Sequence, residues 1–106
     1  MNIDISPRGS GKTTRAIEWL KKDLEKRVLI TYSHEEENRL KHLYPECSHR
    51  IVDWRSYMDS MKSGGSSFSR IQNPRLMIDN ADMFIQKIFD WNVTDLTFTK
   101  DEIDLR

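Results

Sequence analysis

The chain has 106 residues, of which 32% are charged, and its 17 basic side chains are balanced by 17 acidic ones. A net charge of zero excludes a global field that would draw the protein to nucleic acid or to a membrane surface. The length corresponds to one domain, and we expect residues 1–106 to form it. The single cysteine, Cys47, excludes an internal disulfide and is typical of a reducing compartment, so we expect a cytoplasmic protein without a membrane-crossing segment.

The first third of the chain alternates between strand-like and helix-like patterns. Residues 1–5 are expected to form a first strand, central and buried in its sheet, and residues 12–25 a helix with one apolar face. Residues 27–32 (R-V-L-I-T-Y) form a continuous apolar run. Such a run is typical of a parallel strand that is covered on both faces.

The next segment carries clear helix boundaries. Ser33 and Glu36 have the spacing of a capping box, which predicts that a second helix begins here. This helix is expected to run to about Leu43, because Pro45 cannot continue it. A short third strand is expected at 49–53.

The second half repeats the alternation. A third helix with a stripe of aromatic and methionine side chains is followed by a Gly/Ser-rich loop over 62–74. A fourth strand is expected at 75–79, a fourth helix at 81–91 and a fifth strand at 95–99. We expect the loop at 62–74 to be a disordered connector, with a partner-binding loop as the alternative. Because it leads into a strand, it should lie at the edge of the sheet where the strands begin.

Alternating strands and helices predict an α/β fold of three layers with a mostly parallel five-stranded sheet. In such sheets, ligands bind beyond the carboxyl ends of the strands. The segments that follow strands should therefore gather at one edge. They are the loop after Ile5, Ser33-His34, Asp53-Trp54-Arg55, Asp79-Asn80-Ala81-Asp82 and Thr99-Lys100.

The loop after the first strand has the composition of a phosphate-binding loop. Gly9 and Gly11 allow the backbone to curl so that consecutive N–H groups point at phosphate oxygens. The segment resembles the Walker A motif of P-loop NTPases, with Ser6 in place of the first glycine. This resemblance implies that Lys12 would reach the β- and γ-phosphates and that the Thr13 hydroxyl would ligate Mg²⁺. The expected nucleotide-binding residues are Ser6, Pro7, Arg8, Gly9, Ser10, Gly11, Lys12, Thr13 and Thr14.

A second motif lies in the expected fourth strand. Residues 76–79 (L-M-I-D) resemble a Walker B motif, in which Asp79 would hold Mg²⁺ through water opposite Thr13. The order of the two motifs resembles the RecA-type ATPase core of helicases, helicase loaders and phage terminase motors. This resemblance implies a minimal single-domain P-loop NTPase, with ATP and Mg²⁺ as cofactors and DNA as the substrate to be moved. The expected catalytic residues are Lys12, Asp79, Asn80 and Asp82.

The sequence also departs from that group. Asn80 stands where those proteins carry a catalytic Glu, and an amide cannot accept a proton from water at neutral pH. Asp82 is a candidate substitute, although a favourable charge at the start of a helix is the preferred explanation for this residue. The chain has no room for a second lobe, so an arginine from a neighbouring subunit or a protein partner would have to complete the site. Candidates within a homo-oligomer are Arg8, Arg15, Arg55 and Arg106.

Two functions therefore stay open. One is a weak or partner-dependent ATPase of the helicase and terminase kind, and the other is a non-catalytic nucleotide-binding adaptor or inhibitor of a larger machine. A nucleotide kinase is less well supported because no insertion is large enough for a lid. A GTPase is less well supported again, because no N-K-x-D motif is present.

Several other polar residues have simpler explanations. His42, Cys47 and His49 lie close in sequence but lack the paired spacing of a zinc site, so no metal other than Mg²⁺ is expected. His34 is interpreted as an exposed residue within the capping box. Thr97 and Thr99 are candidates for a polar sensor of the nucleotide, but an exposed strand position explains them as well.

Overall fold

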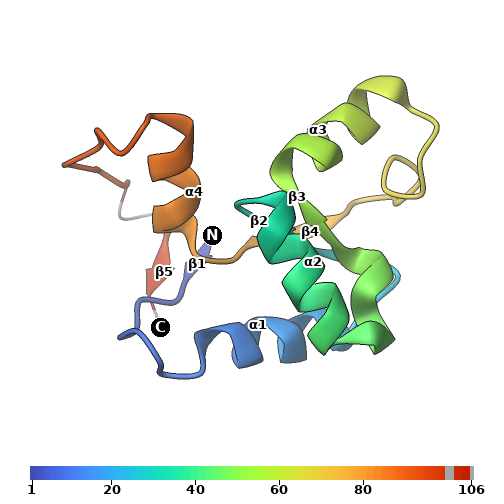
Figure 1. The fold of residues 1–106 in the computed structure, drawn as a ribbon, viewed down its shortest axis with the longest axis horizontal. Helices are drawn as coiled ribbons and strands as arrows, with labels where there is room; N and C mark the ends of the chain where they lie inside the picture. The colour runs from blue at the N-terminus through green and yellow to red at the C-terminus, as the bar shows by residue number, and fades with distance from the viewer. Residues whose placement is uncertain (100–101, 106) are drawn as a thin grey trace.

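The computed structural model describes residues 1–99 and 102–105 (Figure 1). In chain order the elements are β1 (Asn2–Ile3), α1 (Lys12–Lys21), β2 (Arg27–Thr31), α2 (His34–Leu43), the 3₁₀ helix η1 (Pro45–Arg50), β3 (Ile51–Asp53), α3 (Trp54–Ser63), β4 (Arg75–Ile78), α4 (Ala81–Ile88) and β5 (Asp104–Leu105). Within these described ranges, no helix has the length and apolar character needed to cross a membrane.

The core of the protein is a three-stranded, all-parallel sheet with the order β3-β2-β4. The strand β2 is central because its residues Val28, Leu29 and Ile30 form the continuous apolar run, and all three are buried. Helices separate the successive strands along the chain, as parallel pairing requires. The predicted α/β class is therefore confirmed, with three strands in the main sheet rather than five.

The side chains of β2 alternate between two apolar clusters, one on each face of the sheet. Leu29 packs with α1, α2 and η1 on one face. Val28 and Ile30 pack on the other face with Tyr57 of α3. Phe68 and Ile71 are partly buried and pack against this second cluster, so the segment 62–74, although mostly exposed, is anchored to the core at these two residues and is not the disordered connector that we expected. It leads into the amino end of β4, as predicted.

The predicted start of the second helix is confirmed in detail. Ser33 is the N-cap of α2, and its hydroxyl accepts a hydrogen bond of 3.1 Å from the Glu36 backbone N–H. The Glu36 carboxylate pairs with Arg39 instead of closing the capping box. The helix ends at Leu43, and Pro45 begins η1, which extends to Arg50 and shortens the predicted third strand to Ile51–Asp53.

The prediction of a central, buried first strand is wrong. The strand β1 comprises two residues, pairs in parallel with β5 and with no other strand of the described residues, and leaves Met1 and Ile5 exposed. Figure 1 shows the β1–β5 pair beside α4, apart from the three-stranded sheet. The radius of gyration, 14.1 Å, accordingly exceeds the value of about 13 Å for a compact domain of this length.

The prediction of a fifth strand at 95–99 is also wrong. After α4 the chain turns through Asp90 and Trp91, both with positive φ, which also explains why the helix ends before the predicted residue 91. The Gln86 side-chain amide forms two hydrogen bonds with the Val93 backbone: it donates to the carbonyl at 2.7 Å and accepts from the N–H at 3.1 Å. These two bonds hold the segment against α4, and residues 95–99 form no strand. The first helix likewise ends early, at Lys21, in a series of tight turns.

Candidate functional site

The loop between β1 and α1 has the curled backbone that the sequence predicts. Gly9 and Gly11 have φ values of 78° and 84°, in the left-handed region that favours glycine. A Cβ on Gly9 would meet nothing within 4 Å, so there is space for a side chain. Glycine is favoured here because of the positive φ. Because α1 begins at Lys12, directly after the loop, the free backbone N–H groups of its first turn and the positive end of its dipole lie next to the loop.

A single arginine fastens this loop to its helix. The Arg15 guanidinium donates to the Ser10 carbonyl at 2.8 Å and to the Ser6 hydroxyl at 2.9 Å. It also forms an ion pair of 2.9 Å with Asp4, on the segment that leads from β1. The side chain of Ser6, which replaces the expected glycine, therefore accepts a bond that a glycine could not accept. The network gives Arg15 a positioning role in the loop.

The two sequence motifs meet beneath the loop. Thr13 donates a hydrogen bond of 3.3 Å to the Asp79 carboxylate, although the two residues are 66 positions apart. Pairing of β4 with β2 extends to the Asp79 N–H, which donates to the Ile30 carbonyl and holds this residue at the carboxyl edge of the sheet.

Asp79 is only 5% exposed. Burial raises the pKa of its carboxyl above the usual value, and the Thr13 hydroxyl and the Lys12 charge oppose that rise without cancelling it. A buried carboxylate beside a hydroxyl and a cation is a candidate for holding a further cation, because its own ionisation is not fully compensated.

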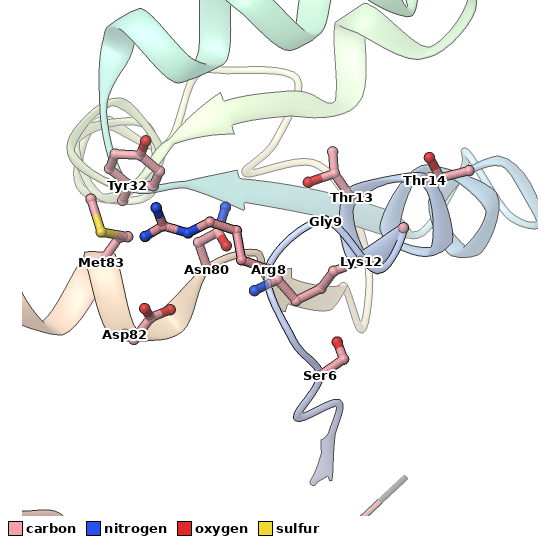
Figure 2. Close-up of a pocket in the computed structure, with 11 residues that line it drawn as sticks. Ser6, Arg8, Gly9, Lys12, Thr13, Thr14, Tyr32, Asn80, Asp82 and Met83 are labelled. Carbon is pink, nitrogen blue, oxygen red and sulfur yellow. The ribbon is translucent and has the colours of Figure 1, made fainter.

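An open cavity of about 580 Å³ lies over this pair, within the range of roughly 300–1,000 Å³ for ligand sites (Figure 2). Its lining residues are Ser6, Arg8, Gly9, Gly11, Lys12, Thr13, Thr14, Tyr32, Asn80, Asp82 and Met83. Most of the residues predicted for the site are thus brought together. Pro7 and Ser10 belong to the loop but do not line the cavity, and Asp79 reaches it through its contact with Thr13.

Two lining residues, Tyr32 and Met83, were not predicted as site residues. Tyr32 directly follows Thr31, the last residue of β2, so its place at the carboxyl end of the predicted strand 27–32 was the available signal. Met83 follows Asp82 in the first turn of α4, and no sequence signal marks it. Figure 2 shows Arg8 reaching across the cavity toward these two side chains.

Asn80 has a backbone role at the cavity wall. It is the N-cap of α4 with φ 53° and ψ 55°, a left-handed conformation that Asn adopts more readily than Glu. Asp82 is exposed on the first turn of α4 and lines the same cavity.

The remaining candidates lie outside the cavity. Thr97 and Thr99 are exposed and do not line it. Arg55 stacks on Trp54, with 5.3 Å between its guanidinium carbon and the ring centroid. Lys100 and Arg106 fall outside the described residues.

Comparison with known protein families, with curated proteins and with solved structures finds no match to this chain. The assignment of a function therefore depends on the chemistry of the cavity and of the residues around it.

Proposed function

We propose that this chain binds Mg²⁺-ATP at the curled loop and acts as a weak or partner-dependent ATPase in a nucleic-acid process. The observation that carries the proposal is the 3.3 Å contact between Thr13 and Asp79, which joins the two motifs at one point below the loop. An apolar strand that ends in an acid is common, but contact with a threonine directly after Gly11-Lys12 is what Mg²⁺-nucleotide chemistry needs.

The residues present fit the nucleotide. The left-handed glycines and the start of α1 offer backbone N–H groups to phosphate oxygens, and Lys12 adds a cation. Thr13 and Asp79 would hold Mg²⁺, which when bound supplies positive charge to the β- and γ-phosphate oxygens. Resemblance to the RecA-type ATPases extends this to an ATP-dependent action on DNA.

The conformation of Asn80 favours a second candidate function. Asn80 is suited to its left-handed backbone, and its amide can orient water but cannot accept a proton. Asp82 is the carboxylate among the residues that line the cavity, and it is the candidate base. If Asp82 does not act as a base, the protein is a nucleotide-binding adaptor or inhibitor that binds a larger machine and does not turn over ATP.

We further propose that the five strands join into the single, mostly parallel sheet of a P-loop NTPase. Leu76 and Ile78 of β4 are 46% and 44% exposed, which is unusual for apolar residues of a parallel strand. Among the described residues, β4 pairs only with β2, so its outer edge is open. Docking of the β1–β5 pair along that edge would cover both side chains and complete five strands.

A partner or a second copy is expected to complete the site. Arg15 is occupied by the loop contacts described above, and Arg8 already lines the cavity of its own chain, so an arginine that acts from across the site would come from a neighbouring subunit or a protein partner. The segment that follows α4 also exposes Phe89 and Trp91. Exposed aromatic side chains are typical of protein–protein contacts, which supports action as a homo-oligomer or with a protein partner.

The test is the release of phosphate from Mg²⁺-ATP by the full chain, with and without single-stranded DNA, alongside a direct measurement of ATP binding. We expect binding, and slow release that DNA accelerates. Binding without release under either condition would favour the adaptor. The absence of ATP binding would refute both versions of the proposal.

Replacement of Arg15 by alanine is expected to weaken ATP binding about tenfold, because the loop loses two hydrogen bonds that hold its curled form. The measurement is a calorimetric titration with Mg²⁺-ATP. Arg70→Ala is the matched control, since Arg70 lies in the segment between α3 and β4. An unchanged affinity in Arg15→Ala would show that the loop keeps its form without the arginine.

A further inference from the structure

A second group of ligand-type side chains lies at the carboxyl end of β3. His34 begins α2, Glu37 follows one turn later, and Asp53 ends β3. The His34 Nδ1 atom is 3.3 Å from Glu37 Oε2 and 3.4 Å from Asp53 Oδ2. The three ligand atoms lie within 4.8 Å of one another. None of the three residues lines the cavity under the phosphate-binding loop.

The two carboxylates are buried and held in place by other groups. The side chains of Glu37 and Asp53 are only 7% and 8% exposed. The Asp53 N–H donates to Glu37 Oε1 at 2.7 Å, and the N–H and hydroxyl of Ser56 donate to Asp53 at 3.0 and 2.9 Å. Burial acts to raise the pKa of Asp53, but the hydrogen bonds from Ser56 and His34 outweigh it and lower that pKa. Asp53 is therefore ionised at neutral pH.

The two buried carboxylates, Glu37 and Asp53, have little positive charge close to them. Lys41 Nζ lies 3.7 Å from Glu37 Oε2, and His34 carries charge only when it is protonated. Buried carboxylates are normally paired with cations or coordinate metals. Lys41 can balance one of the two negative charges, although its 3.7 Å distance is long for an ion pair. The second negative charge would be balanced by a protonated His34 or by a bound cation.

We propose that His34, Glu37 and Asp53 bind a divalent transition-metal ion, with Zn²⁺ as the expected species. Two ligand atoms about 2.0–2.1 Å from a tetrahedral zinc are about 3.3 Å apart, which matches both distances from His34 Nδ1. Metal-binding carboxylates are commonly held in place by hydrogen bonds from neighbouring groups, and here the Asp53 N–H orients Glu37 and the Ser56 hydroxyl orients Asp53. Imidazole favours zinc over Mg²⁺ or Ca²⁺, which prefer oxygen ligands.

Such an ion would link the first turn of α2 to the junction of β3 and α3. His34 is 70% exposed, so the fourth coordination position would face solvent and take water. These residues differ from His42, Cys47 and His49, which lie close together in the sequence but lack the paired spacing of a zinc site. The set found in the structure combines one helix turn with a strand end 16 residues further along, a pairing that no local motif reveals.

The test is a calorimetric titration of the nucleotide-free chain with Zn²⁺, together with its thermal unfolding with and without Zn²⁺. We expect one Zn²⁺ per chain and a rise in Tm, because the ion binds the folded state. His34→Ala is expected to lower the affinity at least about tenfold and to remove the rise in Tm. Because the side chain of His34 is mostly exposed, this variant should fold.

Two further variants separate this site from other metal-binding groups. His42→Ala removes another exposed histidine of α2 and should leave Zn²⁺ binding unchanged. Asp79→Asn removes the carboxylate under the phosphate-binding loop and should also leave it unchanged. Equal Zn²⁺ affinity in the wild type and His34→Ala, loss of binding in Asp79→Asn, or neither binding nor a Tm shift in the wild type would each overturn the proposal. None of these results depends on whether ATP binds.

Discussion

Replacement of Lys12 by alanine is expected to reduce the affinity for Mg²⁺-ATP about 10- to 100-fold. Lys12 lines the cavity at the first position of α1, and across the part of the chain that the structure describes, no group holds its ammonium in a hydrogen bond or ion pair. Its charge is therefore available to phosphate oxygens, and charge-assisted hydrogen bonds of this kind contribute about 1.5–3 kcal/mol. The measurement is a calorimetric titration of each protein with Mg²⁺-ATP.

The fold should survive this change. Lys12 is only half-buried and makes no contact on which the core depends, so we expect the free energy of unfolding to change by less than about 0.5 kcal/mol. Lys22→Ala is the matched control, because Lys22 is exposed at the far end of the same helix and should bind ATP like the wild type. If Lys12→Ala kept the affinity of the wild type, the phosphate-binding role of residues 6–14 would be refuted.

Replacement of Asp79 by asparagine is expected to stabilise the fold and to remove the dependence of ATP binding on Mg²⁺. Burial raises the pKa of the Asp79 carboxyl, so the folded chain holds this proton more tightly than the unfolded chain. The protonated Asp79 carboxyl places no charge in the core, so its contribution to the free energy of unfolding is most favourable at acid pH. This contribution is lost as the pH rises through the raised pKa of Asp79. At neutral pH the full cost of the buried charge is present, and asparagine removes it while still accepting the Thr13 hydrogen bond.

The measurement is the Tm of both proteins at neutral pH and at a pH below the usual range of aspartate. We expect Asp79→Asn to have the higher Tm at neutral pH, by a few degrees, and the difference to shrink in acid. Asp59→Asn, at an exposed position of α3, is the control and should show neither effect. A lower Tm for Asp79→Asn at neutral pH would show that its carboxylate stabilises the fold. An unchanged response of ATP affinity to Mg²⁺ would show that Asp79 does not hold the ion.

The sequence by itself determined the features that depend on neighbouring residues. The apolar run of β2 predicts a covered parallel strand, since its three consecutive apolar side chains, at 28–30, point to both faces of the sheet and need a buried environment on each. Ser33 predicts the start of α2 because its hydroxyl satisfies an N–H in the next turn. Gly9 and Gly11 predict the curled loop because few other residues adopt positive φ at low cost.

Only the tertiary structure decided which segments meet. Strand pairing is a long-range contact, so the pattern of residues 1–5 could not show that β1 would pair with β5 and stay outside the main sheet. The pattern of residues 95–99 likewise could not show that the chain after α4 would be held at Val93 by two hydrogen bonds with Gln86 and that 95–99 would pair with no strand. The approach of His34 to Asp53 depends on the pairing of β2 with β3. Local patterns determine what each segment can become, and the choice among partners depends on which arrangement buries the most apolar surface and satisfies the backbone.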